Sequence, residues 1–218
     1  MDGIGSRPGR GADRARDLAR QMERDISLGD LGAGAWLKQV DLEQRYGGTR
    51  MEIRQALDRL VEKGLVKQLP RRGYRVEDFD PARLAQIMEI RAILEVAAAE
   101  QVIGLLDEPS LAAMQAQAER CHAATQDGTV EEHEQANHEF HRLMLAPCPN
   151  RELVALLFDL RGRVPVAVTR RRNSLALIQR ANAQHFEIIR LIRARDLPAL
   201  QRLMREHNLS PGPALTNP

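Results

Sequence analysis

The sequence predicts a mainly α-helical protein with an aliphatic core. Apolar residues recur at spacings of three and four along most of the 218 residues, and 43% of the chain is hydrophobic while only 3% is aromatic. The strand-like runs are short and form one pair, Leu65–Leu69 and Tyr74–Val76. The chain therefore offers little material for a large sheet.

The composition also indicates a cytoplasmic protein. No apolar run approaches the roughly 18 to 20 residues that a membrane span requires, and the N-terminal end lacks the apolar stretch of a signal peptide. Cys121 and Cys148 are isolated from one another and predict neither a disulfide framework nor a zinc knuckle. We expect two free thiols and no contact with a membrane.

The first part of the chain is predicted to form two helices that lead into a glycine turn. Residues 1–11 are rich in Gly and Arg and are expected to form a flexible arm. An amphipathic helix is predicted from Ala12 to Leu28, and a second over Leu37–Tyr46. Gly47-Gly48 then turns the chain into a third helix.

That third helix is predicted to begin at Thr49, a capping residue, and to stop at Gly64. Arg50 and Arg54 lie four apart on one of its faces, and four apolar residues lie on another: Ile53, Leu57, Leu60 and Val61. The two strand-like runs follow as a hairpin. Over residues 45–75 nine Lys or Arg stand against three Asp or Glu, a density suited to a phosphate backbone.

Helix, helix, glycine turn, helix and hairpin is the element order of a winged helix-turn-helix. We interpret residues 12–79 as such a DNA-binding domain. Its charge supports this, since residues 1–79 carry 16 basic and 13 acidic side chains, against 16 and 17 in the remainder.

The composition changes at Asp80-Pro81, where Asp80 is placed as an N-cap and Pro81 as the first helical residue. Residues 80–209 are predicted to form an antiparallel bundle of about six helices, and residues 210–218 a loose tail. The six expected helices cover Pro81–Leu106, Ser110–Ala124, Thr129–Pro147, Arg151–Arg170, Ser174–Arg195 and Leu197–Leu209. Pro165 is expected to kink or interrupt the fourth.

The chain resembles bacterial transcription regulators of the GntR family, in the FadR-like branch that carries a C-terminal FCD effector domain. The resemblance covers about residues 12–209. It rests first on the runs GDLGAGAWL, LEQRYGGTRMEIRQALDRLVEKGLV and PRRGYRV, and then on EIRAILE, NHEFH, His185 and His207. Six helices rather than seven in the second part resemble the VanR-type subgroup.

The resemblance implies that Arg50, Arg54 and the wing residue Gly73 contact DNA. A guanidinium at the start of a recognition helix binds guanine O6 and N7 with two parallel hydrogen bonds. Thr49 is expected to offer its hydroxyl or amide to a phosphate. The remaining expected DNA-binding residues are Met51, Arg71, Arg72 and Tyr74.

The alternative for the two arginines is a solvated helix face paired with Glu52 and Asp58. Met51 and Glu52 depart from the family pattern, which has small residues or proline there. A carboxylate facing DNA costs affinity unless it accepts from a cytosine amino group, so Glu52 is the unusual residue.

Three histidines and one asparagine are expected to form a metal site in the second domain. Asn137 and His141 share a helical face beside inward-pointing apolar residues, and His185 and His207 border apolar stripes. Three imidazoles and one oxygen ligand suit a divalent transition metal such as Zn²⁺ or Ni²⁺, which can hold a small carboxylate.

The FCD family resembles this arrangement, with an Asp where this chain has Asn137. An amide oxygen is a weaker ligand than a carboxylate, so a polar site that binds its effector without metal stays open as the alternative. His122, His133 and His138 are expected at the surface, with His133 as a possible exception. It lies one turn before Asn137.

Arg91 is the expected partner of an effector carboxylate, because Arg91 and Glu95 match the R-x-x-x-E pattern at the start of FCD domains. The two residues equally suit an ordinary ion pair between positions i and i+4.

Together these features predict a homodimeric DNA-binding regulator, expected to act as a repressor, that responds to a small organic acid. A metal-dependent enzyme is a competing interpretation, but neither an H-E-x-x-H motif nor paired carboxylates accompany the histidines. A DNA-binding dimer with a degenerate, metal-free site is the third.

Overall fold

A computed structural model of the chain describes residues 9–78 and 80–209. The chain divides into two compact units between Phe79 and Asp80. Residues 1–8 of the expected arm and the expected tail 210–218 lie outside the described residues. The arm prediction was wrong for residues 9–11, which already belong to a helix.

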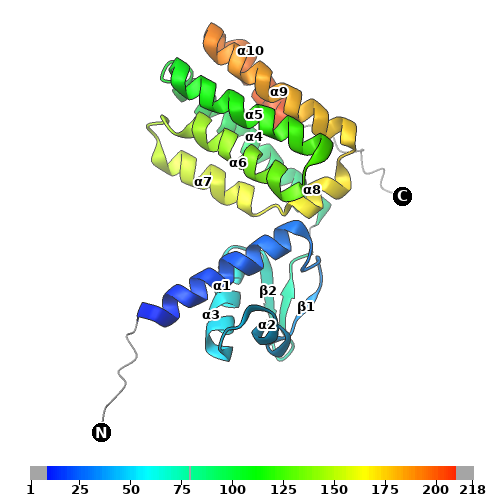
Figure 1. The fold of residues 1–218 in the computed structure, drawn as a ribbon. Coiled ribbons are helices and arrows are strands. Elements are labelled where there is room, and N and C mark those ends of the chain that lie inside the picture. The colour runs from blue at the N-terminus through cyan, green and yellow to red at the C-terminus, as the bar shows by residue number, and fades with distance from the viewer. Residues whose placement is uncertain (1–8, 79, 210–218) are drawn as a thin grey trace. The chain divides into compact units, whose positions relative to one another are not determined.

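The first unit contains three helices and a three-stranded antiparallel sheet of order β1-β3-β2 (Figure 1). Its elements are α1 (Gly9–Leu28), β1 (Trp36–Leu37), α2 (Gln39–Tyr46), α3 (Arg50–Glu62), β2 (Val66–Leu69) and β3 (Gly73–Val76). Leu37 was expected to start a helix but pairs with Tyr74 in the sheet. Its side chain is buried there, and α2 begins only after the extended Lys38.

The glycine turn lets α2 and α3 meet close to α1. Gly47 ends α2 with φ 66°, in the left-handed region that favours glycine. A Cβ on Gly48 would lie 2.7 Å from Cδ1 of Leu18 in α1, so a larger residue there would require the Leu18 side chain or the turn to shift. Ile53, Leu57 and Leu60 on the inner face of α3 are fully buried in the core that results.

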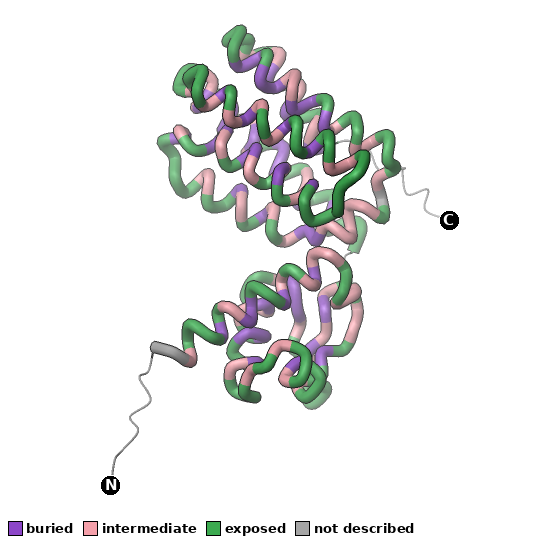
Figure 2. The backbone as a smooth tube through the Cα atoms, in the orientation of Figure 1, coloured by how far each residue is buried: buried purple, intermediate pink, exposed green. Residues whose placement is uncertain are grey.

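The second unit is entirely helical in its described part. Its helices are α4 (Pro81–Val102), α5 (Glu108–Asp127), α6 (Val130–Leu145), α7 (Arg151–Gly162), α8 (Val166–Arg172), α9 (Leu175–Ala194) and α10 (Leu197–Leu209). Most run along one common direction, and α5 neighbours both α6 and α9 while α10 neighbours α4 and α9 (Figure 1). Buried residues lie on the sides of these helices that face one another (Figure 2).

The described part of this unit has seven helices, where about six were expected. Pro165 is extended, with φ −60° and ψ 140°, and separates α7 from α8. Proline lacks an amide hydrogen and clashes with the preceding turn, so it kinks or breaks a helix, and here the helix is broken. The reason for choosing the VanR-type subgroup disappears with this count.

Candidate nucleic-acid interface and candidate metal centre

The start of α3 is fixed by a reciprocal cap between Thr49 and Glu52. The Glu52 amide donates to Oγ1 of Thr49, while the Thr49 amide and hydroxyl both donate to Oε2 of Glu52, each at 2.9 Å. These bonds lower the pKa of Glu52. Glu52 is therefore a capping residue. Because both Thr49 donors are occupied, the expectation that Thr49 gives one of them to a phosphate does not fit this arrangement.

The outer edge of α3 presents the residues that were expected to read DNA. Arg50, Met51 and Arg54 are exposed, and Met51 is 70% exposed despite its apolar side chain. The Nε of Arg50 donates to Oε1 of Gln39 at the start of α2, at 3.2 Å. Sequence reasoning missed Gln39, because its partner lies eleven residues away and only the fold brings the two helices together.

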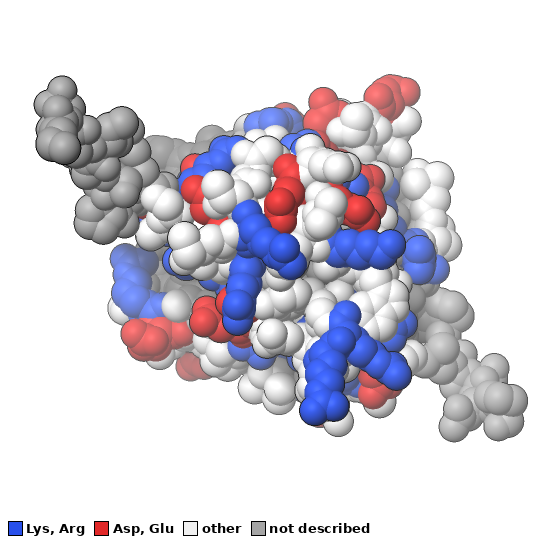
Figure 3. Space-filling model, turned by 90° about the horizontal axis from the view of Figure 1, so that it is seen from below, with Lys and Arg blue, Asp and Glu red and all other residues white. Residues whose placement is uncertain are grey.

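The turn between β2 and β3 forms the wing. Arg71, Arg72 and Gly73 are exposed, and both Arg71 and Gly73 have positive φ, at 61° and 94°. No atom lies within 4 Å of a Cβ built on Gly73, so the glycine serves the turn conformation and not a close contact inside the unit. Several Lys and Arg side chains are exposed on the face viewed in Figure 3.

Tyr74 does not belong to this surface, contrary to expectation. It is 3% exposed, and its hydroxyl donates to Oδ1 of Asp58 at 2.6 Å. Burial and the bond to Asp58 raise the pKa of Tyr74. The alternation of the strand explains the error, because Tyr74 points to the core side while its neighbours Gly73 and Arg75 do not. Asp58 is thus held by Tyr74.

Three of the four expected metal ligands converge in the second unit. His141 of α6, His185 of α9 and His207 of α10 offer ring nitrogens that all lie within 4.8 Å of one another. His141 and His185 are 0% and 1% exposed. Both ring nitrogens of each of these two have no hydrogen-bond partner in the described part of the chain. We call these three residues the histidine triad.

The three rings of the triad are held in their neutral form, which is the form that ligates transition metals. Burial is the largest cause that lowers the pKa of His141 and of His185 well below the usual value, and it lowers the pKa of His207 to about 4. The Arg161 guanidinium lowers the pKa of all three further. Neutral imidazoles have the free lone pairs that transition metals bind, so the residues present fit such an ion.

Asn137 lies on α6 one turn before His141 and is half-buried. Its position on the helix agrees with the expected fourth ligand, and its role as a ligand stays a prediction. Gln184 was missed by sequence reasoning. Its Oε1 lies 3.0 Å from Nδ1 of His207, which gives one triad ring a defined orientation.

Arg91 and Glu95 form part of a buried polar cluster beside the triad. Nη2 of Arg91 contacts Oε1 of Glu95 at 3.4 Å and Oδ1 of Asn208 at 3.2 Å, and Nη2 of Arg161 contacts the same Glu95 oxygen at 2.9 Å. Asn208 also donates to Oε2 of Glu95. The ion-pair interpretation of Arg91 and Glu95 is therefore realised, while an effector contact stays a prediction.

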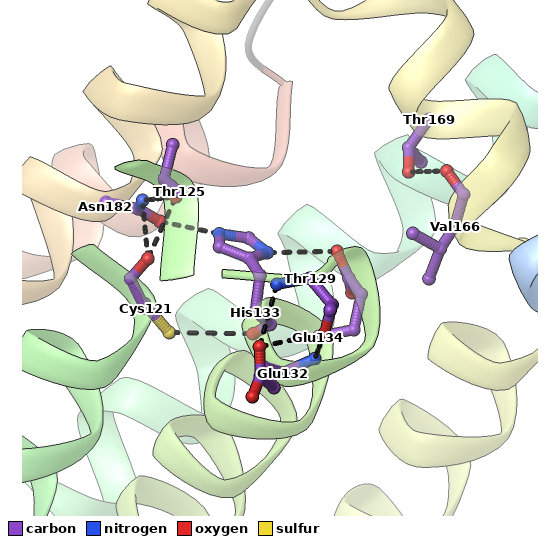
Figure 4. A network of polar contacts seen from close by, with 9 residues as sticks. All are labelled: Cys121, Thr125, Thr129, Glu132, His133, Glu134, Val166, Thr169 and Asn182. Carbon is purple, nitrogen blue, oxygen red and sulfur yellow. Dashed lines mark hydrogen bonds and ion pairs between the residues drawn. The ribbon is translucent and has the colours of Figure 1, made fainter. Parts of the chain in front are cut away.

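A second polar network joins α5, α6 and α9 (Figure 4). The His133 ring lies between Asn182 and Glu134, with Nε2 3.0 Å from Oδ1 of Asn182 and Nδ1 3.3 Å from Oε1 of Glu134. The amide of Asn182 donates to Thr125 and to the Cys121 carbonyl. His133 is buried, so the exception allowed for it was the correct interpretation, whereas His122 and His138 are exposed.

Comparison with known proteins supports the same division. The FCD domain model matches residues 86–210, which is more than half of the chain, and the model for bacterial regulatory proteins of the gntR family matches residues 14–76. The chain is 27% identical over 209 residues to the HTH-type transcriptional repressor GlaR of Escherichia coli K12, covering 91% of this chain and 94% of GlaR.

Two solved structures share the fold. The structure of McbR/YncC of E. coli superposes with a TM-score of 0.78 at 20% identity, over 90% of this chain and 94% of McbR. A putative GntR regulator from Rhodococcus sp. RHA1 gives a TM-score of 0.77 at 16% identity, over 91% and 95% of the two chains. No helix in the described residues is long and apolar enough to cross a membrane. The chain belongs to the GntR family of bacterial regulatory proteins, carries an FCD domain, and is a DNA-binding transcription regulator and not an enzyme.

Proposed function

We propose that the protein is a repressor that binds a pseudo-palindromic operator as a homodimer and responds to a small organic acid held at a metal ion in the FCD domain. GlaR, which is similar to almost the whole chain, is named a repressor. The observation that carries the sensing part of the proposal is the buried histidine triad, in which four ring nitrogens lack a partner among the described residues.

DNA recognition is assigned to the outer edge of α3. This helix would lie in the major groove, with Arg50 and Arg54 directed to bases or phosphates. The bond from Arg50 to Gln39 uses Nε, so the two terminal nitrogens stay available for a bidentate contact with guanine. Met51, exposed between the arginines, suits an apolar contact such as a thymine methyl group.

The triad is assigned to a divalent transition metal, Zn²⁺ or Ni²⁺. Leaving a buried polar group without a partner costs about 1–3 kcal/mol, and a metal ion removes that cost for one nitrogen of His141 and one of His185. Three imidazole ligands leave a coordination position for an oxygen ligand, for which Asn137 and an effector carboxylate are the candidates. Bound there, the metal would supply a fixed positive charge for the carboxylate. Arg91 is the proposed second contact of the effector.

The homodimer is proposed to form through the exposed face of α4. Ile90 and Ile93 are 46% and 54% exposed there, although both are large and apolar. Two antiparallel copies of α4 that cross between these residues would place Ile90 against the partner's Ile93. The same register would place Arg83 against the partner's Glu100, so the face is complementary to itself in charge, as a two-fold interface requires.

Effector binding must favour one arrangement of the dimer to change its affinity for DNA. An acid that bound both arrangements with equal affinity would not change their populations, and so would not change the affinity for DNA. Because the triad draws one ligand from each of α6, α9 and α10, a metal with its effector would tie three helices of the unit together. This is the proposed origin of the response.

The test uses the full-length protein without a His-tag. Duplexes selected by the protein from a random pool are sequenced, and release of the selected DNA is then measured with organic acids, before and after chelation. The proposal expects an enriched inverted repeat and release by an acid only when metal is present. Failure to enrich any duplex would contradict the regulator function, and release that ignores chelation would support the metal-free alternative.

A further inference from the structure

Two arginines converge on one oxygen of a single buried carboxylate. Nη2 of Arg161 and Nη2 of Arg91 lie 2.9 and 3.4 Å from Oε1 of Glu95. Glu95 is 0% exposed, and the arginine side chains are 12% and 11% exposed. One negative charge thus faces two positive charges in a place with little access for water.

Both guanidinium groups keep donors that no described residue satisfies. Nε of Arg91 and Nε of Arg161 are buried without a hydrogen-bond partner. The second oxygen of Glu95 is already occupied by Nδ2 of Asn208, at 2.8 Å. The two arginines therefore share one oxygen and the single charge of Glu95, while buried guanidinium donors are normally paired.

The other carboxylate whose charge reaches Arg91 is Glu134, which raises the pKa of Arg91. Glu134 is itself engaged, because its Oε1 lies 3.3 Å from Nδ1 of His133 on the same helix. Glu134 does not pair with Arg161: among the described residues, the ion-pair partner of Arg161 is Glu95, which it shares with Arg91.

This cluster borders the histidine triad. Asn208, which contacts Arg91 and Glu95, directly follows the triad residue His207 in α10. The cluster and the triad thus meet at the C-terminal end of α10, through the neighbouring residues His207 and Asn208.

We infer that Arg161, together with Arg91, anchors a second acidic group of the metal-bound effector, which makes the effector a short dicarboxylate. One carboxylate would occupy the open position at the triad metal. The other would accept the unpaired Nε hydrogen of Arg161, since a guanidinium group suits a carboxylate. This inference rests on the proposed function, and it assigns a specificity residue that the R-x-x-x-E pattern does not contain.

The test compares acids of equal length in zinc-loaded, full-length protein by isothermal titration. The probes are succinate, glutarate and adipate, each against the monocarboxylate of the same carbon number: butanoate, pentanoate and hexanoate. In the native protein at least one dicarboxylate should bind about tenfold or more tightly than its monocarboxylate partner, as expected for a charge-assisted pair. In Arg161→Gln this ratio should fall to below about threefold, with the zinc content unchanged by elemental analysis.

Two further variants separate the outcomes. Arg161→Lys keeps a cation beside Glu95 and so protects the fold, but loses the planar fork, and its ratio should also fall. Arg163→Gln is the matched control, because Arg163 is 40% exposed and paired with Asp159, and it should keep the native ratio. A native ratio in both Arg161 variants would overturn the inference, as would equal or absent binding of all six acids. Absence of zinc from the native protein would instead contradict the proposed metal site.

Discussion

Nδ1 of His207 lies 3.0 Å from Oε1 of Gln184, and this contact determines which nitrogen of the ring can bind a metal. A carboxamide oxygen only accepts hydrogen bonds, so Nδ1 carries the hydrogen and Nε2 keeps the lone pair. Gln184→Leu should remove this orientation and weaken zinc binding by about 10- to 100-fold. Competition with a chromophoric zinc chelator measures the affinity.

The matched control is Gln179→Leu, which makes the same change at an exposed position of α9. It should leave zinc affinity at the native value. Equal affinities in native and Gln184→Leu protein would show that Gln184 does not orient the ring, or that His207 is not a ligand.

The triad was predictable from sequence, while its surroundings were not. His141 lies beside the apolar residues Phe140 and Met144, and periodicity alone places it at the core side of its helix. The contact between Gln184 and His207 spans 23 residues, and that between Arg161 and Glu95 spans 66. Such pairs follow from how helices pack on one another, which no local pattern reports.

Glu95→Gln should destabilise the second unit. Burial alone raises the pKa of Glu95, but Arg161, Arg91 and Asn208 outweigh it and lower the pKa to about 2. Removing the carboxylate charge leaves two buried guanidinium groups without a counter-ion, for an expected loss of about 3–5 kcal/mol in the free energy of unfolding at pH 7. Urea unfolding of chelated protein measures this loss without a contribution from metal binding.

The same variant tests how the stability that Glu95 contributes depends on pH. The pKa of Glu95 is lowered on folding from 4.5, so the unfolded chain binds more protons at this position between pH 4.5 and about 2. The stabilisation by the charged form is present above pH 4.5 and is lost as the pH falls through that window. The difference in the free energy of unfolding between native and Glu95→Gln protein should therefore decrease as the pH falls from 5 to 3. A difference that stays constant with pH would contradict the charged state of Glu95.

Arg50→Ala should weaken operator binding by about 1–3 kcal/mol and reduce discrimination at one base pair, because a bidentate base contact is lost. Gln39→Leu should weaken binding less, since it removes the orientation of Arg50 and keeps the charge. Fluorescence anisotropy with the selected operator measures both. Arg20→Ala on α1, which removes an exposed arginine paired with Asp17, is the control. An unchanged affinity in Arg50→Ala would remove α3 from the proposed interface.

The DNA-reading helix shows where a sequence pattern assigns function too broadly. Arg50, Met51 and Arg54 are exposed as the helical spacing predicted. Thr49 and Glu52 in the same run instead satisfy each other at the helix start, and Tyr74 faces the core. A capping box has the same residue types in a helix that binds DNA and in one that does not. A strand of four residues is too short for its alternating pattern to decide which side is buried.

Ile93→Arg should convert the dimer into a monomer. In the proposed antiparallel pairing of α4, Ile93 lies against the partner's Ile90, and an arginine there would bury an unpaired charge twice, once from each copy. Leu175→Arg is the matched control, because Leu175 is 58% exposed on α9 and lies outside the proposed face. Light scattering on size-separated protein should give a monomer mass for Ile93→Arg alone.

The monomer should also lose most affinity for an inverted repeat while keeping weak binding to a half-site, because the two recognition helices would no longer be linked. A dimer mass in Ile93→Arg would exclude the α4 face as the interface and leave DNA recognition by α3 untouched.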